Sequence, residues 1–157
     1  MSDTARIIGF RLDDTFGRGR RPEVEQERAV AIEDLLDENS FALDGGPAGP
    51  YQLVLGMADN RLLFQVQNEA GVDLKVIGLA LGPFRRIIRD YHGICESYYD
   101  AIRRLSPMQI ETIDMARRGL HNDGTELLLT RLSGKAIVDF DTGRRLFTLL
   151  CVLHMKG

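Results

Sequence analysis

Glycines and arginines are concentrated in one short segment, Gly17–Pro22 (GRGRRP), a composition suited to binding anions. Glycine lets a backbone approach a ligand closely, guanidinium groups bind phosphate or carboxylate, and proline favours the first turn of a helix, whose N-terminus attracts negative charge. We therefore expect an anion-binding site that includes Arg18, Arg20 and Arg21. The alternative is a charged, solvated loop, because three glutamates follow closely and would neutralise these arginines.

Adjacent arginines recur in the second half of the chain, at Arg85-Arg86, Arg103-Arg104, Arg117-Arg118 and Arg144-Arg145. On the polar sides of predicted helices, such pairs would form a face for RNA or for an acidic protein. The predicted anion-binding set therefore also contains five residues of this half: Arg85, Arg117, Arg118, His121 and Asn122.

The same arginines also have an ordinary structural interpretation, as partners in ion pairs on exposed helix surfaces. Arg86 precedes Asp90 by four residues and Asp100 precedes Arg104 by four, the spacing at which helical side chains meet. Such pairs are common on solvated helices and need no ligand.

Two histidines and two cysteines form mirror-image pairs, His92 with Cys95 and Cys151 with His154, each three residues apart. Two cysteines and two histidines are a known zinc ligand set, so these four are the candidate metal ligands. Both cysteines lie among apolar neighbours in predicted helices, however, as small buried hydrophobic residues do. The prediction is that the protein holds no metal and no cofactor, with the zinc site as the alternative.

Catalytic signatures are weak in this sequence, which has no phosphate-binding loop, dinucleotide fingerprint, HExxH or GxSxG motif. Cys95 is expected to be buried, whereas a nucleophilic cysteine needs an exposed, electropositive setting. His121–Gly124 (HNDG) is expected to cap the end of a helix. We therefore expect a non-catalytic protein. The alternative is a small enzyme acting on a phosphorylated or carboxylated metabolite through His121, Asn122 and nearby arginines.

Helices must position most of these residues. Apolar side chains recur on one side of 83–105, which predicts a core-facing helix: Phe84, Ile87, Ile88, Tyr91, Ile94, Cys95, Tyr98, Ala101, Ile102 and Leu105. Ser106 and Gln109 have the spacing of a capping box and predict a second helix over 107–120. A third is expected over 141–155, apolar nearly all round and so the most buried, with another helical piece at 127–132.

The first half of the sequence predicts one helix and several strands. A strand is expected at 7–12, and a helix from Pro22 to about Asn39. The buried stripe of this helix is expected to be Val24, Ala29, Ile32, Leu35 and Leu36. Three segments separated by turn residues, 51–57, 61–67 and 72–81, predict an antiparallel meander.

Together these elements predict an α+β fold, a small antiparallel β-meander plus an N-terminal strand, packed against one N-terminal helix and a C-terminal helical bundle. With 157 residues and 44% hydrophobic content, we expect a single domain, β-rich over 1–82 and helical over 83–157. No membrane span or signal peptide is apparent, so a cytoplasmic location is expected.

Charge is divided unevenly between the two halves. Residues 1–82 carry 8 basic against 14 acidic residues, and residues 83–157 carry 12 against 9. The second half therefore suits an anionic partner, although its excess is smaller than dedicated nucleic-acid binders show.

Four segments carry a resemblance to a known family: GRGRRPEVEQERAVAIEDLLDENSF, PFRRIIRDYHGICESYYDAI, IDMARRGLHNDG and DFDTGRRLFTLLCVLH. Together they resemble uncharacterised protein family 0262, a set of bacterial proteins of about this length. The resemblance covers nearly the whole chain. It implies no activity, substrate, cofactor or catalytic residue that could be transferred to this sequence.

The function expected from the residues is therefore that of a cytoplasmic binding or interaction module for an anionic partner: a phosphorylated ligand, RNA or an acidic protein. A homodimer in which Tyr98 and Tyr99 face a symmetry mate is a further alternative.

Overall fold

A four-stranded sheet forms the centre of the computed structural model, which describes residues 4–16 and 22–154. Its strand order is β1-β3-β4-β5: Ile7–Leu12, Tyr51–Ala58, Arg61–Gln67 and Asp73–Ala80. Strand β4 is antiparallel to both β3 and β5, and β1 lies at one edge, parallel to β3. The predicted N-terminal strand and meander are confirmed.

The turns of the meander fall at the predicted turn residues. Asp59 and Asn60 join β3 to β4 with φ angles of 52° and 65°, the left-handed conformation that two-residue hairpin turns need. The next turn contains Gly71, with φ 82°, and is tied together by the Asn68 side chain, which accepts hydrogen bonds from the backbone N–H groups of Ala70 and Val72.

A second sheet was not predicted from the sequence. It consists of β2 (Phe41–Leu43) and β6 (Ala136–Val138), which pair antiparallel although nearly a hundred residues separate them. Strands of three residues are too short to show a periodicity, and this pairing follows from tertiary contacts alone.

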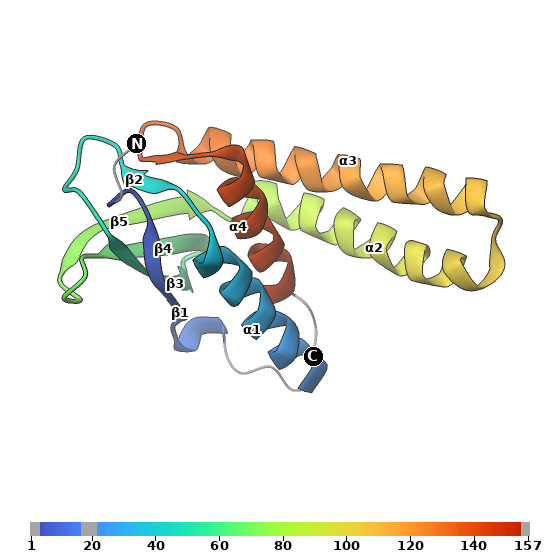
Figure 1. Ribbon diagram of the computed structural model, residues 1–157, viewed down its shortest axis with the longest axis horizontal. Coiled ribbons are helices and arrows are strands. Elements are labelled where there is room, and N and C mark those ends of the chain that lie inside the picture. Colours follow the sequence, from blue (N-terminus) through green and yellow to red (C-terminus); the bar gives the residue numbers. More distant parts are fainter. Residues whose placement is uncertain (1–3, 17–21, 155–157) are drawn as a thin grey trace.

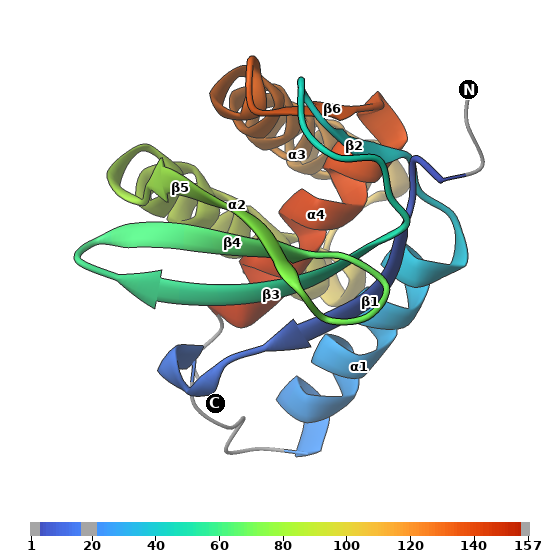
Figure 2. The ribbon, with the colours of Figure 1, turned by 90° about the vertical axis from the view of Figure 1, so that its left-hand side faces the viewer.

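Four helices and one short 3-10 turn, η1 (Asp14–Phe16), complete the described chain. The helices are α1 (Pro22–Asp37), α2 (Gly82–Arg104), α3 (Pro107–Leu132) and α4 (Phe140–Leu153). Figure 1 shows α1 and α4 beside the sheet, whereas α2 and α3 form a long antiparallel hairpin that leaves the body. Figure 2 looks along the hairpin and shows the sheet in front of α4, with β2 and β6 at its upper side. The predicted α+β class is confirmed.

The core lies between the sheet and α4. Alternate residues of β4, Leu62, Phe64 and Val66, are buried on one face of the sheet. Helix α4 is buried nearly all round, as its sequence predicts, and Phe147 and Leu149 are fully inaccessible. None of the helices in the described part of the chain combines the length and apolar character needed to cross a membrane.

The prediction of a helix end near residue 120 was wrong. Helix α3 runs without interruption from Pro107 to Leu132, so His121–Gly124 lies inside the helix, and 127–132 is its last part. The physical reason is packing: a Cβ on Gly124 would lie 2.1 Å from Cζ of Phe147, so the glycine lets α4 approach and does not end the helix. Contacts with α4 outweigh the weak helix propensity of Asn122, Asp123 and Gly124.

The predicted buried stripe of α1 also needs correction. Leu35 is buried as expected, but Ala29 is exposed, Ile32 and Leu36 are only half-buried, and the side chain of Val24 lies outside the described residues. The helix is rotated so that Ala31, together with Leu35, faces α4 and the core. Part of the apolar surface of α1 is therefore left uncovered.

Candidate interaction surface

The α2–α3 hairpin begins in the core and ends in solvent. Phe84 and Ile88, in the first two turns of α2, are buried in the body, as is Leu128 near the end of α3. Beyond Tyr91, the two helices pack mainly on each other, and Ala101 is the residue of the distal part of α2 that is buried. The prediction that the whole apolar side of 83–105 faces the core is wrong for its second half, because the described part of the body does not reach that far (Figure 1).

The turn at the end of the hairpin is well defined. Ser106 caps α3 through a capping box, in which its hydroxyl accepts a hydrogen bond from the Gln109 N–H and the Gln109 side chain accepts one from the Ser106 N–H. This confirms the prediction from sequence. The box fixes the start of α3 at the end of the hairpin that lies away from the body.

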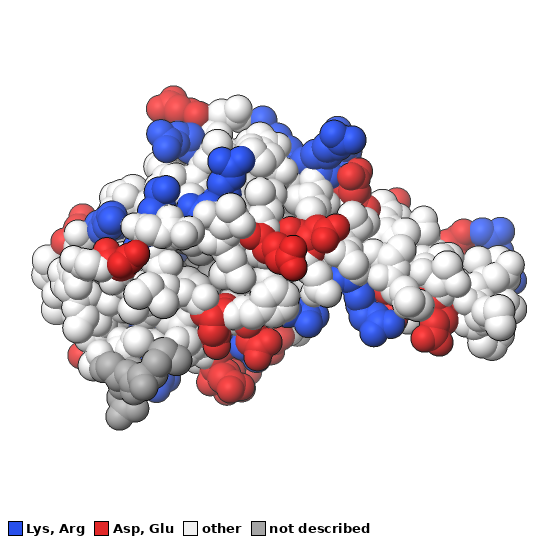
Figure 3. All heavy atoms as spheres, turned by 90° about the horizontal axis from the view of Figure 1, so that it is seen from above, with Lys and Arg blue, Asp and Glu red and all other residues white. Residues whose placement is uncertain are grey.

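Large apolar side chains are exposed at the end of the hairpin. We call them the distal surface: Tyr99, Ile102, Leu105, Met108 and Met115. Met108 is 80% exposed, Tyr99 68% and Met115 60%. Figure 3 shows this end of the hairpin from above, mostly covered by uncharged residues, with charged groups towards its margins. Large apolar side chains exposed at a projecting end are a feature of interaction sites.

The arginines of α2 are mostly without carboxylate partners. Arg104 pairs with Asp100, as predicted, whereas the predicted pair of Arg86 with Asp90 is not formed. Among the described residues, no acidic side chain lies within ion-pair distance of four arginines of α2: Arg85, Arg86, Arg89 and Arg103. All four arginines are exposed. Helix α2 therefore presents to solvent guanidinium groups that no described carboxylate neutralises.

Arginines of α3 behave differently. Asp114 accepts a hydrogen bond from Arg117 Nε at 3.1 Å and forms a second ion pair with Arg118 at 3.2 Å. The hydrogen bond to Asp114 raises the pKa of Arg117, and the Arg117 guanidinium also lies over the Tyr98 ring, 5.0 Å from its centre. These two arginines therefore stabilise the hairpin and are already partly neutralised.

His121 anchors the hairpin to α4. Its Nε2 lies 2.8 Å from Oγ1 of Thr148, and that hydroxyl donates a hydrogen bond to the Arg144 carbonyl. Because the single hydroxyl proton is used in this way, Thr148 Oγ1 must accept a hydrogen bond from Nε2–H, and in the neutral ring this leaves Nδ1 unprotonated. Within the described structure, this buried Nδ1 has no hydrogen-bond partner.

The surroundings of His121 keep it neutral. Its ring packs edge-on against Tyr91 and Phe147, with ring centres 5.3 and 5.2 Å away. Burial lowers the pKa of His121 to about 4, and the positive charges of Arg144 and Arg117 contribute to the shift. His121 is therefore a packed residue of the α3–α4 contact.

The neighbouring turns of α2 carry two further polar side chains, those of Tyr91 and Cys95. Burial raises the pKa of Tyr91 to about 12, helped by the adjacent Cys95 thiol. Burial likewise raises the pKa of Cys95, although this side chain is half-buried and not fully buried as predicted. Cys151 is buried as predicted, and burial raises its pKa as well. Neither thiol is activated as a nucleophile.

The two histidines among the four candidate zinc ligands are engaged in other contacts. His92 Nε2 lies 2.8 Å from the carbonyl oxygen of Cys151, and His154 Nδ1 lies 2.7 Å from that of Leu150. In the segments that the structure describes, no three His, Cys, Asp or Glu side chains are grouped so that they could hold a metal ion. The His92 contact attaches α2 to α4, and the zinc site stays the alternative prediction.

The predicted anion-binding set is only partly assembled. Arg117 and His121 are one turn apart on α3, whereas Arg85 lies near the C-terminal end of α4, where its charge helps to lower the pKa of the half-buried His154. Asn122 is exposed beside His121. Arg18, Arg20 and Arg21 lie outside the described residues, so the Gly-Arg site stays a prediction.

The distal surface was missed as a site, although a signal for it existed. The apolar side of 83–105 extends along the whole helix. The strands of the meander have eight residues or fewer, so they are too short to cover an apolar side of that length. Such an excess of apolar helix indicates either a helical hairpin or an external partner.

Comparison with known proteins gives relatives over the full length of the fold. A UPF0262 protein of Rhizobium leguminosarum bv. trifolii is 55% identical over 97% of this chain and 96% of its own. A UPF0262 protein of Rhodospirillum rubrum is 54% identical over the whole of this chain and 97% of its own length. Another, of Mesorhizobium japonicum, is 56% identical over 98% of this chain and 95% of its own length. No solved structure matches.

The model of the Uncharacterised protein family (UPF0262) matches residues 4–156, which include the sheet, the hairpin and α4. The chain therefore belongs to the UPF0262 family.

Proposed function

We propose that this protein is a non-catalytic interaction module that binds an acidic protein through the α2–α3 hairpin. The observation that carries the proposal is the distal surface, five exposed large apolar residues at the end of a hairpin that leaves the body. Exposing such residues lowers solubility, and the presence of five of them at a projecting end favours a docking role.

The charge of α2 supports an acidic partner. The four arginines without carboxylate neighbours lie on the same helix as Tyr99, Ile102 and Leu105. Apolar contacts at the distal surface would supply affinity, and the arginines would steer a negatively charged partner and set its orientation.

The chemistry of the distal surface favours protein over RNA. Single-stranded RNA is bound by stacking on aromatic or guanidinium planes, whereas the distal surface has one tyrosine and four aliphatic or methionine side chains. Methionine is flexible and polarizable, and it is common on surfaces that receive apolar helices. An amphipathic acidic helix laid along the hairpin would match both features.

Two sequence-based alternatives stay predictions. The enzyme would act through His121, whose imidazole is packed between Tyr91 and Phe147. The homodimer would use Tyr98 and Tyr99; Tyr99 is exposed, and Tyr98 is half-buried beneath Arg117. A molar mass measured by light scattering separates a dimer from a monomer that binds another protein.

The apolar part of the proposal is tested with a double variant, Tyr99→Ser with Met108→Ser. The purified protein serves as bait in a nuclease-treated bacterial lysate, and captured proteins are quantified by mass spectrometry. We expect the variant to lose about ten-fold or more of the specific capture, because central apolar and aromatic anchors carry most of the energy of an interface. Its melting temperature should be unchanged, since both residues are exposed.

The matched control is Val76→Ser with Ile137→Ser. These side chains are 57% and 60% exposed but belong to the body and not to the hairpin. Equal capture by the wild type and the hairpin variant would refute the proposal. If the protein captures a partner only from a lysate that has not been treated with nuclease, the partner is RNA and not an acidic protein.

The charged part is tested with a defined probe, poly-glutamate, and the variant Arg89→Glu with Arg103→Glu. We expect the wild type to bind the polymer at low salt, and the variant to bind it at least about ten-fold more weakly. Reversing Arg118, which already shares Asp114, should matter less. If both substitutions have the same effect, the arginines of α2 are not the recognition element.

A further inference from the structure

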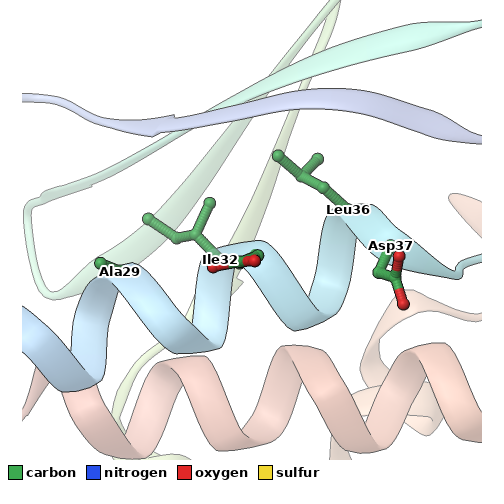
Figure 4. A pocket seen from close by; sticks show the side chains of 5 residues that line it. Ala29, Ile32, Leu36 and Asp37 are labelled. Atoms are coloured by element: carbon green, nitrogen blue, oxygen red, sulfur yellow. The ribbon is translucent and has the colours of Figure 1, made fainter.

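A second surface, separate from the hairpin, lies on α1, on the side that faces β1. A groove of about 540 Å³ is lined by five residues of α1: Ala29, Ile32, Glu33, Leu36 and Asp37. Figure 4 shows Ile32 and Leu36 pointing from α1 towards the strand that crosses above it, which is β1. The floor of the groove is apolar, and two carboxylates one helical turn apart form its rim.

The strand towards which Ile32 and Leu36 point, β1, is open on one side. In the four-stranded sheet, β1 pairs only with β3 and forms the edge. Successive residues of a strand direct their N–H and C=O groups to alternate sides, so about half of the backbone groups of β1 face away from β3. At the start of the strand, Asn39 satisfies the N–H and C=O groups of Ile7 from that side. No strand occupies the remaining edge in the described part of the chain.

The groove is also strongly acidic. Residues 22–37 contain six acidic side chains and one arginine, Arg28, which is buried. Neither Glu33 nor Asp37 has a basic group within ion-pair distance among the residues that the structure describes, and both are exposed. An occupant that fits this surface carries positive charge as well as apolar side chains.

We propose that the groove between α1 and β1 binds an extended, basic segment of another protein, which adds a strand to the edge of the sheet. The backbone of the segment pairs with β1. Alternate side chains then point into the groove, where the apolar ones contact Ala29, Ile32 and Leu36, while lysine or arginine reaches Glu33 and Asp37. A groove between an edge strand and a helix is a recurrent setting for this mode of peptide recognition.

This inference is independent of the proposed function, because it uses another surface and a partner of opposite charge. If both hold, the protein joins an acidic partner at the hairpin to a basic segment at α1. Either can fail without affecting the other, since the residues changed in the two tests do not overlap.

The test uses a fluorescent peptide of about eight residues in which lysine and valine alternate, a length that matches a typical strand. We expect saturable binding, measured by fluorescence anisotropy. A glutamate–valine peptide should not bind, because the rim is acidic. A lysine–valine peptide N-methylated at alternate residues should also fail to bind, since the methyl groups remove the donors that pair with β1.

The decisive variant is Glu33→Lys with Asp37→Lys, which should weaken binding of the lysine–valine peptide about ten-fold or more. Its matched control is Glu27→Lys with Asp34→Lys, which changes the net charge by the same amount. These two residues are exposed on another side of α1, so the control should leave binding within about two-fold. A third variant, Ala29→Phe, fills the groove without changing charge and should also weaken binding.

Three results would overturn the proposal. The first is no saturable binding up to about 1 mM peptide, the second is equal loss in both charge variants, and the third is undiminished binding of the N-methylated peptide. A second copy of the chain is the competing occupant. If light scattering shows a dimer that Glu33→Lys with Asp37→Lys dissociates, the groove is a self-association surface and the proposal is wrong.

Discussion

At the scale of single residues, His121 shows how burial changes the role of a side chain whose type suggests chemistry. Its Nε2 donates to Thr148, its Nδ1 is unprotonated, and two aromatic rings enclose it. A neutral histidine fits this environment, whereas an imidazolium would have to be desolvated beside Arg144 and Arg117. The residue that looked most catalytic therefore contributes to stability.

This arrangement predicts a pH dependence of stability. The pKa of His121 is about 4 in the folded protein and about 6.5 when unfolded, so the unfolded chain binds more protons between these values. Stability is therefore fully present above about pH 6.5 and falls as the pH decreases towards 4. Between pH 7.5 and pH 5, the loss due to His121 should be about 2 kcal/mol.

Urea denaturation at several pH values measures this loss, and His121→Gln isolates it, because glutamine keeps an N–H donor for Thr148 but does not titrate. His154, whose pKa burial also lowers, stays unchanged in both proteins. Parallel curves of unfolding free energy against pH for wild type and variant would contradict the assignment.

At the scale of elements, the contact between α3 and α4 determines where the hairpin is attached. Gly124 faces Phe147 at a distance that leaves no room for a Cβ, and Gly143 of α4 lies close to Leu129 of α3. Two glycines, one on each helix, let the backbones approach closely, and this approach keeps α3 helical through a segment of weak helix propensity.

Gly124→Ala should therefore destabilise the protein, by about 1–3 kcal/mol, because its Cβ would overlap the Phe147 ring. The matched control is Gly119→Ala on the same helix, where a Cβ would meet no atom within 4 Å. That change should stabilise by roughly 0.5–1 kcal/mol, since alanine favours helix more than glycine does. Denaturant unfolding compares the two, and a Gly124→Ala variant as stable as Gly119→Ala would show that the contact adapts.

At the scale of the whole molecule, two surfaces of different chemistry lie on different parts of the chain. The hairpin combines apolar residues with arginines that have no carboxylate partner in the described part of the chain, and α1 combines an apolar groove with carboxylates. The charge asymmetry of the sequence has a structural counterpart here, because the acidic excess of the first half is concentrated on α1. A protein with two such surfaces is suited to bringing partners of opposite charge together.

The projecting hairpin also predicts the overall dimensions in solution. A compact domain of 157 residues has a radius of gyration of about 15 Å. Small-angle X-ray scattering should give a larger value and a distance distribution with a tail at long distances, because the distal half of the hairpin leaves the body (Figure 1). Removing about two turns from each helix should shorten that tail. A radius of about 15 Å or less for the monomer would mean that the hairpin folds back.

The sequence by itself determined the strands of the meander, their turns at Asp59-Asn60 and Gly71, the starts of α2 and α3, the Ser106–Gln109 capping box and the family. These features depend on local periodicity and on residues close together in the chain, so they can be read without a fold.

Only the tertiary structure decided which apolar surfaces are covered. The sequence shows that one side of 83–105 is apolar, but whether body, neighbouring helix or solvent meets it depends on segments far away in the chain. The same holds for Ile32 and Leu36 of α1, for His121, which Phe147 and Thr148 bury, and for the pairing of β2 with β6. Periodicity specifies the side of an element that avoids water, and only long-range contacts specify what replaces the water.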